Sequence, residues 1–336
     1  IGYLKVKKND LILSAQNLHL GNCNVNLRFE HGIISPAYKV YELVDCNPLF
    51  VQAWIKMDKT KDFFLKSSTE GASVCRKNIL WEELYKQELV VPAIEEQTVI
   101  GTYFEQFDQL ITLHQRKCDE IKKLKKYMLQ NMFPQDEEKV PKIRFYGFTD
   151  DWEQRKLGEV ADIVGGGTPS TNVSNYWDGN IDWYAPAEIS DQIFLSSSQR
   201  KITEKGYNNS SAKMLPIGTV LFTSRAGIGK TAILSKKGCT NQGFQSIVPH
   251  KDELDSYFIF SRTDELKRYG EIVGAGSTFV EVSGKQMANI EMMMPKTISE
   301  QKVIGAYFAK LDHLITLHQR KCDELKNMKK FMLQNM

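Results

Sequence analysis

The chain has 336 residues and a mass of 38.5 kDa, which predicts two or more domains at about 100 to 200 residues each. Hydrophobic residues make up 42% and charged residues 25%, a composition that excludes disordered and collagen-like chains. Lysine and arginine exceed aspartate and glutamate only by 44 to 41, so any nucleic-acid surface must be a local feature.

Localisation follows from what the sequence lacks. No apolar run approaches the ~20 residues that span a bilayer, and no secretory signal opens the chain. The six cysteines are scattered, with no C-x-x-C pair, so neither a disulfide framework nor a zinc site is predicted. They are Cys23, Cys46, Cys75, Cys118, Cys239 and Cys322. We expect a cytoplasmic protein with reduced thiols, no bound metal and no membrane partner.

Residues 1–95 form the first predicted domain, which repeats in order the second half of a larger domain further along the chain. The corresponding segments are residues 9–13 with 218–222, 32–38 with 240–245, 70–73 with 274–277 and 91–92 with 294–295. The front of the larger domain, from Trp152 to about Leu215, has no counterpart before Ile1. We therefore expect the first domain to lack its front part.

Residues 96–132 and 298–336 are predicted to form two long helices of nearly the same sequence. Aligned from Glu96 and Glu300 at an offset of 204, 27 of 37 positions are identical. Neither copy contains proline, and each has one early glycine, Gly101 or Gly305. Each helix would be about 55 Å long, too long to be buried within one small domain. Each is therefore expected to pair with another helix.

Two rows of residues recurring every seven positions form the predicted seam between these helices. The first row is Ile100, Phe107, His114, Ile121 and Met128, with Ile304, Leu311, His318, Leu325 and Met332 in the second copy. The other row follows three places later and is Tyr103, Leu110, Lys117, Leu124 and Asn131, with Tyr307, Leu314, Lys321, Met328 and Asn335.

The economical pairing of two copies in one chain is antiparallel about a local two-fold axis, which places His114 beside His318. We interpret these histidines as a polar device that sets the register, because single buried polar residues specify helix pairing. A metal site is the alternative, since histidine is a common metal ligand.

Residues 133–148, with two prolines and a run of acidic residues, are predicted to be a linker. Residues 149–297 form the second predicted domain. Its predicted strands are 161–164, 181–184, 219–223, 232–234, 245–248 and 290–293, and residues 256–269 form its one secure helix. The predicted fold class is α+β, with two mixed α/β domains separated by an antiparallel coiled coil of two long, near-identical helices.

This order of domain, long helix, domain, long helix resembles the specificity subunit of type I restriction-modification systems. Residues 152–160 (WEQRKLGEV) resemble the opening of that family's target-recognition domain. Later segments resemble its following motifs, namely residues 166–170 (GGTPS), 223–230 (TSRAGIGK), 241–246 (NQGFQS) and 276–278 (GST). Pro92 with Glu96-Gln97, and Pro295 with Glu300-Gln301, resemble the start of its conserved helices.

The resemblance implies a protein without catalysis of its own. Its two target-recognition domains would each read one half of a bipartite site in double-stranded DNA, and its paired helices would fix the spacing. The helices would also dock two modification subunits, which bind S-adenosylmethionine and methylate adenine. Restriction subunits would add ATP- and magnesium-dependent translocation and cleavage. No cofactor is expected in this chain itself.

Two motifs raise the competing hypothesis of an enzyme. Residues 224–231 (SRAGIGKT) end like a phosphate-binding P-loop, but Ser224 stands where the motif requires glycine. Residues 47–50 (NPLF) are similar to the Asn-Pro-Pro-aromatic motif of adenine methyltransferases, with Leu49 replacing the second proline. We favour a strand and turn for the first motif and a helix N-terminus at Asn47 for the second.

Candidate DNA contacts are polar residues in loops, where each one has ordinary solvent exposure as its alternative. Arg225, Lys230 and Thr231 are candidates for phosphate contact. Gly165, Gly166 and Gly167 form either a backbone nest for phosphate or a tight turn. The candidate base readers are Thr168, Ser170, Thr171, Asn172, Asn208, Asn209, Ser210 and Lys213 in the second domain, and Gln16, Asn17, His19, Asn22, Asn24 and Arg28 in the first.

Asn241, Gln242 and Gln245 have side chains suited to adenine, although a recurring motif more readily holds the fold or a phosphate. Lysines at 122–126 and 326–330 are interpreted as solvated helix faces, with DNA neutralisation as the alternative. A third hypothesis is a coiled-coil scaffold with globular adaptors and no DNA role. Basic surfaces shared by both domains would favour the DNA reader over that scaffold.

Overall fold

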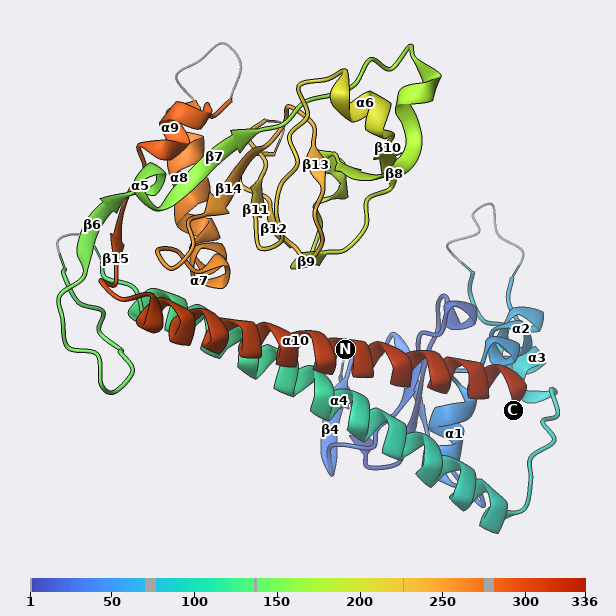
Figure 1. Cartoon of the computed structure of the whole chain (residues 1–336). Helices are drawn as coiled ribbons and strands as arrows, with labels where there is room; N and C mark the ends of the chain where they lie inside the picture. Colours follow the sequence, from blue (N-terminus) through green and yellow to red (C-terminus); the bar gives the residue numbers. More distant parts are fainter. Residues whose placement is uncertain (1, 70–76, 136–137, 226, 275–280) are drawn as a thin grey trace. The chain divides into compact units, whose positions relative to one another are not determined.

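The computed structural model describes residues 2–69, 77–135, 138–225, 227–274 and 281–336. Three parts of the predicted segments lie outside these ranges, namely Cys75, residues 70–73 and residues 275–278. The chain divides into two compact units, residues 1–120 with 315–336 and residues 121–314. Both divisions fall within the long helices α4 (Ile94–Asn131) and α10 (Ile298–Asn335), seen in Figure 1. In the described ranges no helix has the length and apolar character needed to cross a membrane.

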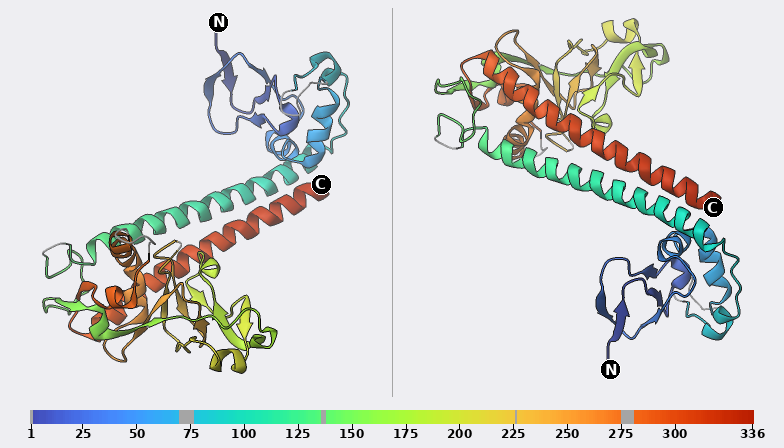
Figure 2. Two further views of the ribbon diagram at one scale, coloured as in Figure 1. Left: turned by 90° about the horizontal axis from the view of Figure 1, so that it is seen from above. Right: turned by 90° about the horizontal axis from the view of Figure 1, so that it is seen from below.

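The first unit combines five short strands with short helices. These are β1 (Leu4–Lys7), β2 (Leu11–Ser14), the 3-10 helix η1 (Leu18–Leu20), β3 (Cys23–Val25), β4 (His31–Ile34), β5 (Tyr38–Tyr41), α1 (Pro48–Trp54), α2 (Asp58–Lys66) and α3 (Trp81–Tyr85). An antiparallel sheet has the order β3-β2-β5, and β1 pairs with β4. Leu13, Val25, Phe50 and Phe64 belong to the core between sheet and helices. Figure 2 shows these elements beside the first part of α4.

The second unit contains the remaining elements. Its strands are β6 (Glu153–Lys156), β7 (Ala161–Gly165), β8 (Trp177–Tyr184), β9 (Phe194–Leu195), β10 (Arg200–Ile202), β11 (Val220–Phe222), β12 (Thr231–Leu234), β13 (Cys239–Thr240), β14 (Gln245–Pro249) and β15 (Glu291–Met294). Its short helices are α5 (Leu157–Val160), η2 (Ser174–Tyr176), η3 (Pro186–Glu188), α6 (Glu204–Asn208), α7 (Ser256–Ser261), α8 (Thr263–Gly274) and α9 (Gly284–Ala288).

Three sheets organise the second unit. The largest has the order β7-β14-β11-β12-β9, in which only β12 and β9 run parallel. A smaller sheet has the order β10-β8-β13, and β15 pairs with β6. Phe222, Ile247, Phe258 and Phe308 share one core, which joins the large sheet to α7 and α10. A separate core around Trp177 and Trp183 supports the small sheet.

The strand order supports the expected repeat between the two units. The first unit's sheet β3-β2-β5 has the same order and directions as β12-β11-β14 in the second. Asn9 and Gly218, which the sequence aligns just before β2 and β11, both adopt a positive φ, 71° and 86°. In the second unit β14 also pairs with β7, and β7 comes from the front segment for which the sequence finds no counterpart.

Most of the second unit's expected strands form close to their predicted positions. The predicted helix over residues 256–269 instead divides into α7 and α8, with Arg262 between them. The buried Arg262 side chain contacts Glu265 and donates to the Met293 carbonyl. Short helices α5, α6 and α9 were not predicted, because four or five residues give too little hydrophobic periodicity.

The segment predicted as a linker is partly packed. Phe133 is buried and its ring stacks on Phe308 with centroids 5.8 Å apart. Arg144 makes a two-pronged contact with the buried carboxylate of Glu300, at 2.7 and 2.9 Å. Such bidentate, largely buried pairs are among the stronger ionic contacts in proteins. The linker's two described ends are therefore tied to the start of α10.

Candidate nucleic-acid interface

The two tryptophans of β8 fix the glycine-rich segment that follows β7. Trp183 Nε1 donates to the Gly167 carbonyl at 2.8 Å, and Trp177 Nε1 donates to the Ser170 carbonyl at 3.2 Å. The rings meet edge to face, 5.1 Å apart. Because both indole N–H groups are used on backbone, residues 167–170 are held against the small sheet.

Close backbone approach explains the run of glycines here. A Cβ on Gly166 would lie 2.0 Å from the Asn241 carbonyl oxygen, and one on Gly167 would lie 2.3 Å from Ser211. Gly165, Gly166 and Gly167 are absent from the described glycines with positive φ. These glycines therefore do not supply the left-handed residue of an αR-αL nest, which was the less favoured of the two alternatives. Residues 166–170 have no turn assignment either, and Gly166 and Gly167 pack closely against residues 211–212 and 240–241.

The predicted polar readers of the second unit gather around this segment. Ser170, Thr171 and Asn172 are exposed, and so are Asn208 at the end of α6 and Asn209 and Lys213 after it. The Asn175 carbonyl accepts from Thr203 Oγ1 at 2.9 Å, which joins the loop before β8 to the start of α6. The half-buried Ser210 donates to the Tyr207 carbonyl. The structure thus brings two loops from separate parts of the sequence to one surface.

The third part of this surface is the turn at Asn241 and Gln242. Asn241 Oδ1 accepts from the Gly243 amide at 2.8 Å, so this side chain shapes its own turn. Gln242 is exposed, and its Oε1 accepts from the hydroxyl of Thr168. Gln245 is half-buried on β14. The structural interpretation of this motif is therefore favoured for Asn241, while Gln242 remains at the surface.

A hairpin loop joins β11 to β12, and its described residues are 223–225 and 227–230. Thr223 closes it by donating to the Gly227 carbonyl at 2.7 Å and accepting from the Lys230 amide at 2.9 Å. A P-loop requires a helix after its lysine, whereas Thr231 begins strand β12. The P-loop interpretation is therefore wrong for this segment.

The three predicted phosphate contacts of this hairpin have different surroundings. Lys230 is exposed, and Arg225 is exposed with its Nε 2.7 Å from Glu281. Thr231 is half-buried, and its hydroxyl hydrogen-bonds Thr263 at 2.9 Å. The Thr231 hydroxyl thus joins β12 to the start of α8.

A buried carboxylate neutralises two lysines beside the small sheet. Asp182 is 1% exposed, with Oδ1 3.2 Å from Lys201 and Oδ2 3.2 Å from Lys236. The Lys236 contact is an ion pair without hydrogen-bond alignment. Burial raises the pKa of Asp182, but the Ser198 amide and the two lysines outweigh it and hold that pKa at about 2. Asp182 therefore stays charged and fixes β8 to its neighbours.

In the first unit the predicted readers separate into exposed and structural residues. Gln16, Asn22, Asn24 and Arg28 are exposed. Asn17 is half-buried in a left-handed conformation, and its Oδ1 accepts from the Lys77 amide at 3.2 Å. His19 is only 8% exposed, so its prediction as a DNA contact is wrong. Helix η1 turns His19 inward together with Leu18.

Asn47 also has a structural role. Its side chain accepts from the amides of Leu49 and Phe50 at 3.0 and 3.2 Å, and α1 begins at the next residue, Pro48. This is the expected helix cap, with proline at the first helical position, so the interpretation of residues 47–50 as a helix N-terminus is confirmed. In the described ranges, three or more His, Cys, Asp or Glu side chains are nowhere grouped to hold a metal ion.

In each unit a buried glutamine near the start of the long helix contacts the start of a short helix. Gln97 and Gln301 are equivalent in the repeat and are 2% and 3% exposed. Gln97 Oε1 accepts from the amide of Asn47, the cap of α1, at 2.9 Å. Gln301 Oε1 accepts from the amide of Asp255, the cap of α7, at 3.0 Å. The two glutamines thus fasten equivalent helix starts.

We call each of these contacts between a short helix and the start of a long helix a joint. The early glycines of the repeat belong to the same joints. A Cβ on Gly101 would lie 2.6 Å from the Phe50 nitrogen, and one on Gly305 would lie 2.4 Å from Asp255 Oδ1. Only glycine allows the short helix of each unit to approach this closely. The glycines and the Glu-Gln pairs are visible in the sequence repeat, but their contacts with the short helices appear only in the structure.

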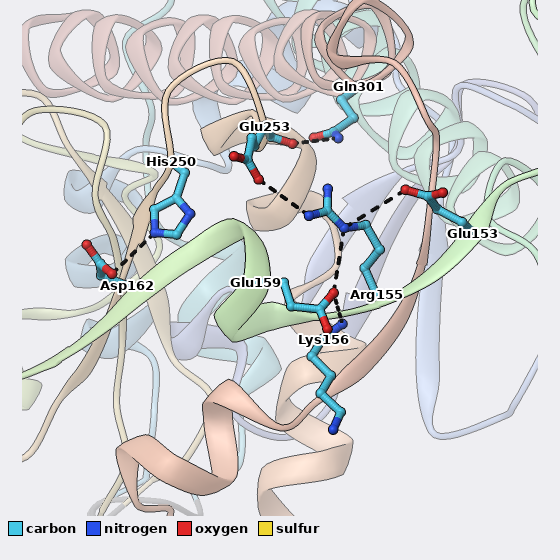
Figure 3. Close-up of polar contacts among 8 residues, drawn as sticks. All are labelled: Glu153, Arg155, Lys156, Glu159, Asp162, His250, Glu253 and Gln301. Carbon is cyan, nitrogen blue, oxygen red and sulfur yellow. Dashed lines mark hydrogen bonds and ion pairs between the residues drawn. The ribbon is translucent and has the colours of Figure 1, made fainter.

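Arg155, in the opening motif of the second domain, supports the same joint. Figure 3 shows its guanidinium among Glu153, Glu159 and Glu253, at distances of 3.9, 3.7 and 3.4 Å. The Glu253 carbonyl in turn accepts from Gln301 Nε2 at 3.0 Å. This motif therefore links β6 and α5 to the start of α10.

Within each unit, residues later in α4 contact residues earlier in α10, so the contacts run in opposite directions along the two helices. In the first unit Asp108 meets Lys329 at 2.5 Å and Cys118 lies 3.9 Å from the Ile315 carbonyl. In the second, Lys125 meets Asp312 at 2.6 Å. His114 and His318 place their Nδ1 atoms 2.9 Å apart, which confirms that the two histidines lie near one another.

The second row of the predicted seam is misplaced by one residue. Leu110, Leu124 and Met328 are 43% to 47% exposed. The buried row instead lies four places after the first, at Phe104, Cys118, Phe308 and Cys322. Spacings of three and four alternate along any such seam, so periodicity alone does not choose between the two rows. Phe104 turns inward because it packs on Ala53 and Met57 of the first unit.

Comparison with known proteins matches this organisation. A family model described as the type I restriction modification DNA specificity domain matches residues 149–327. This chain belongs to that family. The MjaIX specificity subunit of Methanocaldococcus jannaschii is 37% identical over 165 residues, which cover 47% of this chain and 38% of that protein. A second specificity subunit of that organism, MjaX, described as putative, is 24% identical over 84% of this chain and 66% of its own length.

The fold is also found among solved structures. The type I restriction-modification S subunit from M. genitalium aligns with a TM-score of 0.63 and 14% identity, covering 99% of this chain and 83% of its own. At this identity the likeness concerns the fold alone. The chain spans between about two fifths and two thirds of the length of the two curated relatives above.

Proposed function

We propose that this chain is the non-catalytic DNA-specificity subunit of a type I restriction-modification complex. Each globular region reads one half of a bipartite site in double-stranded DNA. The two long helices form an antiparallel coiled coil that sets the distance between the half-sites. The same helices dock two modification subunits, and restriction subunits join the resulting complex.

The duplicated joint is the observation that best supports this proposal. Gln97 with Gly101, and Gln301 with Gly305, attach two different globular regions to near-identical helices through the same contacts. Buried, hydrogen-bonded amides and close backbone packing resist bending at these points. A rigid joint is needed if helix length is to set a spacing on DNA. A flexible adaptor would not require the same buried joint twice.

The polar surface of the second unit supports a reading role. The exposed side chains lie on two loops and at the end of α6, next to the small sheet, and they are Ser170, Thr171, Asn172, Asn208 and Lys213. Side-chain amides and hydroxyls supply donors and acceptors for base edges, whereas lysine suits phosphate. Preformed loops lower the ordering cost of binding. In the first unit Gln16, Asn22, Asn24 and Arg28 are the corresponding candidates.

Repeat-equivalent apolar residues support the docking of two like partners. They are Leu113 with Leu317, Leu124 with Met328, and Tyr127 with Phe331, and all six are 43% to 66% exposed. Large apolar side chains on a helix surface commonly mark partner contacts when they gather. Because the two copies are so similar, one kind of partner would recognise both. These residues are the ones we assign to the modification subunits.

The chemistry of the complex is assigned to those partners. S-adenosylmethionine, ATP and magnesium would bind to the modification and restriction subunits. In this chain the segment resembling a P-loop is a hairpin between two strands, and the Asn47 side chain caps a helix. The residues that raised an enzymatic hypothesis therefore have structural roles.

Adenine-methylation mapping of the host genome tests the proposal. We expect one split motif to disappear when the gene is removed and to return with the wild-type gene, while the modification subunit is present throughout. The double variant Gln97→Ala, Gln301→Ala should restore the motif poorly, and Thr102→Ala, at an exposed position one residue from Gly101, should restore it fully. An unchanged methylation pattern after gene removal would contradict a specificity role. ATPase activity or S-adenosylmethionine crosslinking by the purified chain would favour an enzyme instead.

A further inference from the structure

Arg200 differs from most arginines of the second unit in what it contacts. Other arginines lie against carboxylates, namely Arg144, Arg155, Arg225 and Arg262. The guanidinium carbon of Arg200 instead lies 3.7 Å from the ring centroid of Trp177 and 5.7 Å from that of Trp183. Among the residues that the structure describes, no carboxylate pairs with Arg200.

Stacking on Trp177 orients this guanidinium and leaves its donors available. A guanidinium carbon 3.7 Å above a ring centroid fits the usual stacked arrangement, in which the N–H donors lie in the guanidinium plane and stay free for other partners. Trp177 is itself held by its surroundings, because it is 8% exposed, packs edge to face on Trp183 and donates to the Ser170 carbonyl. Arg200 is therefore exposed, and its contact with Trp177 orients the two parallel N–H donors of its guanidinium.

Its position places Arg200 with the candidate reading loops. It begins β10, an edge strand of the sheet β10-β8-β13. Trp177 links it directly to Ser170 in the first loop, and β10 leads into α6 and the second loop. The adjacent Lys201 is paired with buried Asp182, so its charge is already compensated.

Resting on the proposed function, we propose that Arg200 reads a guanine in the half-site bound by the second unit. A planar fork matches O6 and N7 of guanine in the major groove, and this is the commonest specific arginine contact. A phosphate contact needs only a positive charge, which lysine supplies as well. A guanine contact requires the fork that Trp177 holds in orientation. Trp177 is thus the positioning residue for Arg200.

Selection from a pool of randomised DNA duplexes tests this inference whatever sequence the protein recognises. The full chain, with its modification subunit, is incubated with the pool, and bound duplexes are sequenced. Wild-type protein should enrich a split motif with a G·C pair in one half-site. Arg200→Lys and Arg200→Ala should both lose the preference at that pair by roughly 10- to 100-fold, with preferences elsewhere in the motif retained. Trp177→Phe should weaken it partly.

Arg268 provides the matched control. It is an exposed arginine on α8, which Figure 1 shows across the same unit from β10. Arg268→Lys should enrich the wild-type motif. Two results would overturn the guanine contact while the proposed function stands. One is an unchanged motif with Arg200→Ala. The other is a loss of affinity with Arg200→Ala that is equal for all duplexes and is restored by Arg200→Lys. Failure of wild-type protein to enrich any motif would overturn both.

Discussion

Replacing Gly305 by alanine distinguishes close packing at the joint from the usual stabilising effect of alanine in a helix. In an exposed helix interior this change stabilises by about 1 kcal/mol, because alanine is the better helix former. Here the new Cβ would lie 2.4 Å from Asp255 Oδ1 and 3.0 Å from the Phe258 nitrogen. Overpacking of this kind costs about 1–3 kcal/mol, and displacing the Asp255 cap from the Phe258 amide adds about 1 kcal/mol.

The expected net effect is a loss of about 2 kcal/mol in the free energy of unfolding. For a unit of this size it corresponds to a fall in Tm of about 4–8 °C. Thermal and urea denaturation measure the change. In an Asp255→Gly background, where the closest atom is gone, the penalty should shrink. A rise in Tm for Gly305→Ala would refute the reasoning, because it would show that the helix start has room for a side chain.

Other contacts give further predictions. Asp182→Asn should lose about 2 kcal/mol at neutral pH, since the pKa of Asp182 is about 2 against 3.8 ordinarily. That stabilisation is complete above about pH 4 and disappears as the pH falls towards 2, so a pH-independent difference in urea titrations would contradict it. His114→Leu and His318→Leu should be non-additive by about 1 kcal/mol in a double-mutant cycle. Gln97→Ala and Gln301→Ala should each cost about 2 kcal/mol through two lost buried hydrogen bonds, and a loss below 0.5 kcal/mol would argue against the joint.

The long helices could be predicted because two separate signals agreed. Near-identity over 37 positions fixed their ends within about two residues, and the position of the histidines in the repeat predicted their contact. The second seam row could not be predicted in the same way. Leu110 and Leu124 are as apolar as the residues that are buried, and the choice is made by tertiary packing of Phe104 against the first unit.

Side-chain chemistry alone did not distinguish surface from structural polar residues. His19 and Thr231 carry suitable groups for DNA, but η1 buries the first and a hydroxyl contact occupies the second. Gln97 and Gln301 carried a usable signal, since they are identical in two copies at the start of long helices. Arg200 gave no such signal, because its contact with Trp177 spans 23 positions in sequence and depends on the pairing of β8 with β10.

Lengthening both helices tests the central claim most directly. Residues 113–119 and 317–323 have the same sequence, LHQRKCD, so duplicating both segments adds one heptad to each helix and preserves the seam. Seven residues add about 10 Å of helix, equal to about three base pairs of DNA at 3.4 Å each. Methylation mapping should show both half-sites unchanged and the gap between them longer by about three base pairs. A functional variant that methylates with the original gap would contradict a spacing role for the helices.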